Sequence, residues 1–161
     1  MSIIDVTDWE KEVYVIGRRK KYLYVDPITR RKAYFKYPWT RKNGDVTLGE
    51  VWSEKIAADI GQVIKIPTPE VFIAKNNNEY GSLSYSFLEN EEQLYHGVVF
   101  LNAYFEKIFK TTDFDPINIK FPRLDALLQI TESFKVQKGF IDILIFDALI
   151  GNCDRHSENW D

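Results

Sequence analysis

The stretch FDALIGNCDRHSENW, residues 146–160, decides how this chain can fold. It begins within a segment, residues 139–150, that is apolar nearly all round a helical wheel, so we expect a helix buried on most sides. We predict that this helix ends at Gly151, and a densely polar loop follows it. Loops held by a rigid element are where binding and catalytic side chains concentrate. The polar loop is therefore the leading candidate for a chemical site.

The loop carries a carboxylate and an amide at a spacing that suits phosphoryl transfer. That reaction needs a carboxylate that accepts or orients the substrate hydroxyl proton, and an oxygen ligand for magnesium a few residues further on. Asp154 and Asn159 stand five residues apart, as do the Asp and Asn of protein-kinase catalytic loops. The usual order His-Arg-Asp is replaced by Asp154-Arg155-His156. We expect Asp154 to be the catalytic base, His156 to support it in the loop, and Asn159 to bind magnesium.

A zinc site at Cys153 and His156 is a competing interpretation of the same loop. Structural zinc sites use four ligands, usually cysteine and histidine. The chain has no second cysteine, and its one other histidine is His96. We therefore favour a hydrogen-bonding role for His156.

Taken together, residues 146–160 resemble the signature of HipA-like serine/threonine kinases, and most of all the compact branch that lacks an extra N-terminal subdomain. Phosphatidylinositol-kinase-like enzymes have a similar Asp-Arg-His and Asn arrangement. The resemblance implies an α+β, protein-kinase-like fold: an N-terminal antiparallel sheet lobe with one helix, residues 1–88, and the start of a helical C-terminal lobe, residues 89–161. It also implies ATP and Mg²⁺ as cofactors, and transfer of the ATP γ-phosphoryl to a protein serine or threonine.

Two upstream residues match the phosphate-holding pair of the family. Lys36, at the end of the alternating segment 32–37, matches the lysine that holds the α- and β-phosphates as a point charge. A helical glutamate orients that lysine, and we choose Glu54, with Glu50 as its competitor. Thr47 and Glu50 have the spacing of a capping box, which explains Glu50 more simply.

The loop that covers the phosphates in the family departs from the usual pattern here. Gly17 is followed by four cations instead of further glycines. We expect Arg18 and Lys20 to hold phosphates in place of backbone amides. The serine-rich autophosphorylation motif that some HipA proteins carry in this loop is also missing.

Residues at the end of the first lobe match the segment that leads into the hinge. We expect Phe87, Leu88 and Glu89 to border the adenine, mainly through backbone groups.

Alternation and turn signals place the other elements. The helix that starts at Thr47 is predicted to run to about residue 60, with Gly61 as its cap and an apolar stripe formed by Val51, Trp52, Ile56 and Ile60. Strands are predicted at residues 12–17, 22–26, 32–37, 70–74 and 82–88, and further helices at 91–110, 123–134 and 139–150.

Composition and charge narrow the function classes. Hydrophobic residues make up 45% and charged residues 28% of the chain, which indicates a folded protein. The net charge of −3 and the lack of a helix-turn-helix pattern argue against nucleic-acid binding, and no apolar run is long enough to span a membrane. With one cysteine and no secretory signal, a cytoplasmic protein is expected, and a secreted effector stays open.

The family's second metal-binding aspartate follows the catalytic loop at some distance, whereas this sequence stops at Asp161, too close to Asn159 to replace it. The resemblance thus covers nearly all of this chain but about half of a complete kinase, so we expect a fragment or a natural truncation. The partners implied are a protein substrate and a protein that covers the unfinished helical lobe. The alternative function is a catalytically inactive binding or regulatory module, such as a toxin–antitoxin component.

Overall fold

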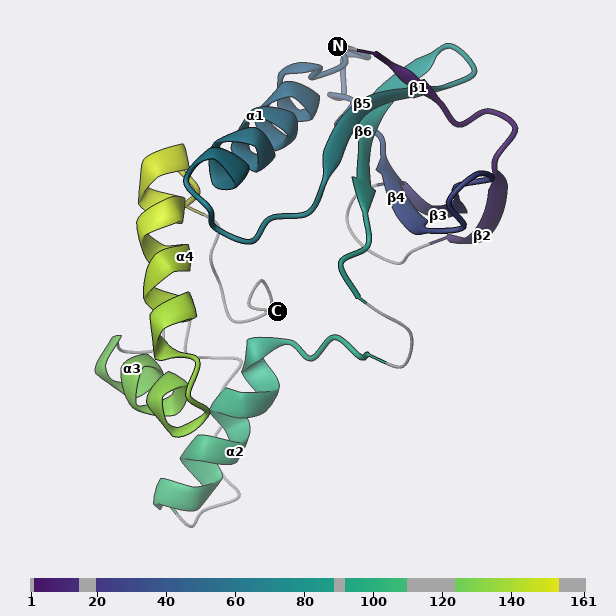
Figure 1. Cartoon of the computed structure of the whole chain (residues 1–161). Helices are drawn as coiled ribbons and strands as arrows, with labels where there is room; N and C mark the ends of the chain where they lie inside the picture. Colours follow the sequence, from purple (N-terminus) through teal and green to yellow (C-terminus); the bar gives the residue numbers. More distant parts are fainter. Residues whose placement is uncertain (1, 15–19, 89–91, 110–123, 154–161) are drawn as a thin grey trace. The chain divides into compact units, whose positions relative to one another are not determined.

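The computed structural model describes residues 2–14, 20–88, 92–109 and 124–153 (Figure 1). The chain divides into two compact units, Met1–Glu89 and Asn90–Asp161. The first unit is built from strands and one helix, and the second from helices. In the parts of the chain that the structure describes, no helix has both the length and the apolar character that crossing a membrane requires.

The first unit contains a six-stranded sheet with the order β1-β5-β6-β4-β3-β2. Its strands are β1 (Ile4–Asp5), β2 (Glu10–Tyr14), β3 (Lys21–Val25), β4 (Lys32–Lys36), β5 (Val71–Asn76) and β6 (Glu79–Tyr85). Neighbouring strands are antiparallel, as predicted, except that β1 pairs with β5 in parallel. The sequence analysis missed β1, because a two-residue strand is too short to show alternation.

Strand β6 differs most from its prediction, which placed it at residues 82–88. It begins at Glu79, where it pairs with Asn76 across a tight turn, and it ends at Tyr85. The end is set by its neighbour, because β4 begins at Lys32 and the Ser86 NH donates the last bond to the Lys32 carbonyl (2.8 Å). A strand without a partner has no ladder to continue.

Alternation gives the sheet two different faces. One face is the apolar core of the unit, rich in aromatic rings that meet edge to face, such as Phe35 and Tyr37 with centroids 4.8 Å apart. The buried cluster there comprises Val6, Tyr24, Ala33, Phe35, Tyr37, Ala74, Leu83 and Tyr85. The opposite face carries Lys36 and Ser82 and is covered by α1 (Gly49–Val63), which packs against β5 and β6 (Figure 1).

Helix α1 begins without the predicted capping box, so that prediction is wrong. The residue before the helix is Leu48, and no side chain caps the first turn. The Thr47 hydroxyl donates to the Trp39 carbonyl (2.8 Å), and Glu50 Oε2 accepts from the Trp39 NH (3.2 Å). Both side chains therefore hold the backbone of the β4–α1 connection, a tertiary contact that competes with the local capping pattern.

The face that α1 turns toward the sheet also differs from the predicted apolar stripe. Trp52 and Ile56 are about half exposed, whereas the buried positions are Val51, Ala58 and Gly61. Val51 is thus the one residue of the predicted stripe that is buried; the other two buried positions are the small residues Ala58 and Gly61, which the stripe did not include.

Gly61 is a packing residue inside α1 and not its cap. A Cβ at Gly61 would lie 2.3 Å from Thr68 Cγ2, so only glycine allows this approach. The helix continues to Val63 and ends with Lys65 in the left-handed region (φ 61°). The Lys65 NH donates to the Gln62 carbonyl (3.2 Å) and the Ile66 NH to the Gly61 carbonyl (2.9 Å). This is the Schellman arrangement that closes many helices.

The second unit contains α2 (Gly97–Phe109), α3 (Leu124–Ser133) and α4 (Gln137–Ile150), and α3 packs against both α2 and α4. Its core is formed by Leu101, Leu127, Ile130 and Phe140. The prediction that α4 is buried on most sides is wrong for the described residues. Phe140, Phe146 and Asp147 are buried, but Ile145 and Leu149 are about 60% exposed (61% and 59%).

Candidate functional site

Lys36 and Glu54 form the ion pair that the sequence analysis expected. Lys36 ends strand β4, and its Nζ donates to Glu54 Oε1 over 2.6 Å. Both side chains are partly exposed, Lys36 by 36% and Glu54 by 27%. The pair lies on the sheet face that α1 covers, so a half-buried positive charge is held at a defined place on the first unit.

Ser82 completes this arrangement and was missed by the sequence analysis. Its Oγ donates to Glu54 Oε2 over 2.5 Å, so both oxygens of the carboxylate have a donor. Ser82 is 2% exposed and stands directly opposite Lys36 in the β4–β6 register. A small polar residue within a predicted strand was the available signal, but its partner depends on a register between strands that sequence patterns do not fix.

The three side chains leave donor capacity on Lys36. An ammonium has three N–H donors, and among the described residues the Lys36 Nζ has Glu54 as its one hydrogen-bond partner. The remaining donors can bind an anion that approaches from the exposed side. Glu54, by contrast, is satisfied on both oxygens and acts as a fixed support.

Glu50, the competing choice for the helical glutamate, does not take this position. Its Oε2 accepts from the Trp39 NH, on the connection that precedes α1. Glu54 is therefore the helical carboxylate that contacts Lys36.

Lys20 lies on the other face of the sheet from Lys36. The Tyr37 NH donates to the Lys20 carbonyl (3.1 Å), and the neighbouring pair in the ladder is Lys21 with Lys36. Because side chains alternate, Lys20 shares the face of Tyr37 and Lys21 shares the face of Lys36. Lys20 Nζ lies 3.9 Å from the Tyr37 ring centroid and 3.7 Å from Glu79 Oε2. The structure does not bring Lys20 together with Lys36 and Glu54.

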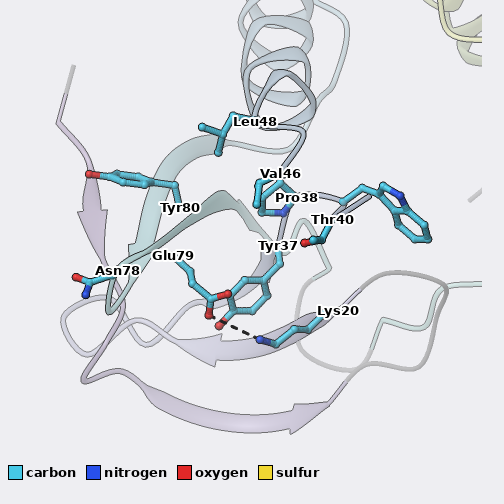
Figure 2. Close-up of a pocket in the computed structure, with 10 residues that line it drawn as sticks. Lys20, Tyr37, Pro38, Thr40, Val46, Leu48, Asn78, Glu79 and Tyr80 are labelled. Atoms are coloured by element: carbon cyan, nitrogen blue, oxygen red, sulfur yellow. Dashed lines mark ion pairs between the residues drawn. The ribbon is translucent and has the colours of Figure 1, made fainter. Parts of the chain in front are cut away.

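Lys20 instead contributes to a hollow at the end of the sheet where β4 ends and β6 begins. Figure 2 shows its ion pair with Glu79 beside the ring of Tyr37. The hollow has a volume of about 520 Å³ and is lined by Lys20, Tyr37, Pro38, Trp39, Thr40, Val46, Leu48, Asn78, Glu79 and Tyr80. Neither Lys36 nor Glu54 lines it, so the hollow is distinct from the ion-pair site.

The predicted adenine-bordering segment follows β6. Phe87 is 62% exposed, and the Leu88 NH donates to the Ser86 hydroxyl over 3.2 Å. Glu89, the third residue of the prediction, lies outside the described residues, as does Arg18 of the covering loop.

The end of α4 fixes how the chain enters the predicted catalytic loop. Gly151 adopts a left-handed conformation (φ 69°), and the Asn152 NH donates to the Asp147 carbonyl (2.9 Å), which confirms the predicted helix end. The buried Asp147 carboxylate also accepts from Asn152 Nδ2 over 2.8 Å. Asp154, His156 and Asn159 lie beyond the described residues, so their roles stay predictions. Within the described ranges, no three His, Cys, Asp or Glu residues gather in a way that could hold a metal ion.

A second carboxylate, Asp26, is buried on the core face and has a different environment. It accepts from the Tyr85 hydroxyl (2.7 Å) and from the NH groups of Ile28 (2.8 Å) and Thr29 (3.1 Å). Burial raises the pKa of Asp26, but these hydrogen bonds outweigh it and lower the pKa to about 2. Burial, together with the bond to Asp26, raises the pKa of Tyr85 to about 12. These donors all belong to the first unit itself, so the Asp26 carboxylate stabilises the β3–β4 turn.

Comparison with known proteins places the fold. No protein-family model matches the chain, and no curated protein matches it. The chain is similar to the crystal structure of the Helicobacter pylori proinflammatory kinase CtkA, with a TM-score of 0.77 and 22% sequence identity. The match covers 99% of this chain and 54% of that one, so this chain spans about half the length of that kinase. The fold is thus α+β and kinase-like, with an N-terminal sheet lobe.

Proposed function

We propose that this chain is a HipA-like, ATP-dependent protein serine/threonine kinase, or a part of one. The observation that carries the proposal is the 2.6 Å contact between Lys36 Nζ and Glu54 Oε1 on a kinase-like sheet lobe. A lysine on the strand before the helix, paired with a helical glutamate, is the arrangement with which protein kinases hold ATP phosphates. The sequence of the loop at residues 151–160 supports the same reaction.

In the proposed reaction, Lys36 contacts the α- and β-phosphates of ATP with the donors that Glu54 leaves unused. Glu54 keeps the ammonium in place, so little reorganisation is needed when the nucleotide binds. Asp154 accepts the proton of a serine or threonine hydroxyl on the protein substrate as that oxygen attacks the γ-phosphorus; the bond from the γ-phosphorus to the β–γ bridging oxygen breaks, and ADP leaves. Mg²⁺, which Asn159 would help to hold, neutralises negative charge on the phosphate oxygens when it is bound. His156 supports the loop.

The placement of the two lysines changes which cations we propose for the covering loop. Lys21 shares the sheet face of Lys36, whereas Lys20 is paired with Glu79 on the other face. Lys21 therefore replaces Lys20 in the proposal, and Arg18 remains a candidate. Phe87, Leu88 and Glu89 keep their proposed place beside the adenine.

A second candidate function is a binding module that uses the fold without catalysis. The exposed apolar residues on α4, such as Ile145 and Leu149, favour it, because exposed apolar surface of this kind marks protein interfaces. In that case a protein partner covers α4, and nucleotide has no effect on the chain.

The test is whether ATP with magnesium stabilises the chain. Ligand that binds only the folded state at 100 times its Kd adds about 2.7 kcal/mol to the free energy of unfolding, which a melting curve detects. Lys36→Ala should remove this ATP-dependent shift. Lys32→Ala is the matched control, because Lys32 lies on the same strand and face and pairs with Glu12 over 3.0 Å.

If ATP with magnesium does not change the melting temperature of the wild-type chain, the result contradicts the proposal and favours the binding module. Catalysis is tested separately, by transfer of labelled phosphate to a protein acceptor. Asp154→Ala should abolish the transfer.

A further inference from the structure

We infer that Ser82 is a positioning residue that sets the Lys36 ammonium for nucleotide through the carboxylate of Glu54. The inference rests on the proposed function, because it concerns how the same site is held ready. Nothing in the sequence pattern assigns Ser82 a role, and its contribution follows from the geometry alone.

The three side chains form a chain of two short hydrogen bonds. Ser82 Oγ donates to Glu54 Oε2 (2.5 Å), and Lys36 Nζ donates to Glu54 Oε1 (2.6 Å). Hydrogen bonds to an ionised group are about twice as strong as neutral ones. With one oxygen anchored to the strand, the carboxylate can rotate little, so the oxygen that faces Lys36 is held in one place.

The backbone fixes where Ser82 stands. Ser82 pairs directly with Lys36 across β4 and β6, so the hydroxyl and the lysine leave the sheet side by side on one face. The strands are tightly packed at this point, because a Cβ on Gly81 would lie 2.5 Å from the Lys36 carbonyl oxygen. The anchor and the lysine therefore belong to one rigid piece of sheet, and α1 supplies the glutamate between them.

A neutral donor is well suited to this position. A second cation at residue 82 would compete with Lys36 for Glu54, and an apolar side chain would leave one oxygen of a partly buried carboxylate without a donor. Such an unsatisfied oxygen destabilises the bound geometry and favours rotation of Glu54 toward water. A hydroxyl satisfies the oxygen and leaves the positive charge of Lys36 for an anion.

A purely structural role for Ser82 predicts something different. Buried polar groups are nearly always hydrogen-bonded, and Glu54 could simply be the partner that satisfies the serine. Removal of the serine would then lower stability without acting on nucleotide through Glu54. A double-mutant cycle separates these two roles, because residues that act through one another are not additive.

The experiment measures the Kd of ATP by calorimetry for wild type, Ser82→Ala, Glu54→Gln and the double variant, with unfolding curves for each. Ser82→Ala should weaken ATP binding about tenfold. In the Glu54→Gln background the same change should have almost no further effect. Ser84→Ala is the matched control, since Ser84 lies two residues on in β6, on the same face, and should bind ATP like wild type.

If Ser82→Ala fails to fold, Ser82→Cys replaces it, because a thiol is only slightly larger than a hydroxyl and is a weaker donor; a several-fold weakening is then expected. Wild-type affinity in a folded Ser82 variant would overturn the inference, and so would additive effects in the cycle.

If wild type itself does not bind ATP, the proposed function fails. The positioning of Lys36 by Ser82 is then tested separately, by the Lys36 ammonium signal in a ¹⁵N NMR spectrum. Faster proton exchange at Lys36 in Ser82→Ala, but not in Ser84→Ala, would support it; no change would overturn it.

Discussion

The two faces of the sheet each hold a hydrogen-bonded carboxylate, and the two groups are held in different ways. On the core face, Asp26 is 6% exposed and takes all its donors from neutral groups inside the unit. On the face under α1, Glu54 is partly exposed, and one of its two donors is a cation that also faces outward. The bonds to Asp26 stabilise the β3–β4 turn. The bonds to Glu54 hold the charge of Lys36, which can still bind an anion.

The two sites differ in the groups that donate hydrogen bonds to the carboxylate, and not in the carboxylate itself. Neutral donors inside the unit satisfy the oxygens of Asp26 and leave no donor for a ligand. Asp26 therefore contributes to stability alone. A cation such as Lys36 has more donors than one carboxylate oxygen can take. We therefore expect changes on the core face to alter stability, and changes on the other face to alter ligand binding.

The largest effect should come from Gly81→Ala, which adds a methyl group at a tightly packed point on the core face. Its Cβ would lie 2.7 Å from Phe35 Cζ and 2.5 Å from the Lys36 carbonyl oxygen, so a strand or a ring must shift. Overpacking of this kind lowers the free energy of unfolding by up to about 3 kcal/mol, which urea denaturation measures. Gly49→Ala is the control, because a Cβ at Gly49 meets nothing within 4 Å. Equal stability of the two variants would contradict the packing described here.

The next effect is acid sensitivity from Asp26. Its folded-state pKa of about 2 lies below the ordinary value of 3.8, so its contribution to stability is complete above pH 3.8 and is lost as the pH falls toward 2. Tyr85→Phe removes one donor, so it should lower the free energy of unfolding by about 1–2 kcal/mol at neutral pH and weaken the decline between pH 4 and 2. Urea titrations at several pH values measure both. An unchanged acid decline in Tyr85→Phe would argue against the bond as its cause.

The smallest effect compares two adjacent lysines. Lys21→Ala should weaken ATP binding about threefold at low salt, and less at high salt, because a partly exposed cation is screened by ions. Lys20→Ala should leave ATP affinity unchanged, since its charge is paired with Glu79 on the other face. Calorimetry at two salt concentrations measures the difference. A larger loss for Lys20→Ala than for Lys21→Ala would reverse the assignment of the two faces.

Sequence patterns could predict the parts of the site that depend on local order. Alternation placed Lys36 in a strand, and the resemblance to the kinase family then singled out Lys36 and a helical glutamate, for which Glu54 was chosen; the structure joins these two residues. The capping box at Thr47 failed because the Trp39 backbone, distant in sequence, offered these side chains other partners.

Non-local geometry explains what the sequence could not provide. Ser82 acquires its partner through the register of β4 and β6, and a shift of one residue would turn it to the other face. The alternation of side chains along a strand likewise places Lys20 and Lys21 on opposite faces, although the two residues are both cations and adjacent in the sequence. The apolar stripe of α1 was misassigned at Trp52 and Ile56, because the side of the helix that meets β5 and β6 is set by tertiary packing and not by the helix sequence alone.

The central claim is that Asp26, on the core face, contributes to stability, whereas Glu54, on the face under α1, contributes to ligand binding. It is tested most directly by measuring ATP affinity and the free energy of unfolding, side by side, for Glu54→Gln and Asp26→Asn. We predict that Glu54→Gln weakens ATP binding at least about tenfold with little loss of stability, and that Asp26→Asn lowers stability by about 2 kcal/mol with ATP affinity unchanged. Loss of ATP affinity in Asp26→Asn together with wild-type affinity in Glu54→Gln would contradict the account.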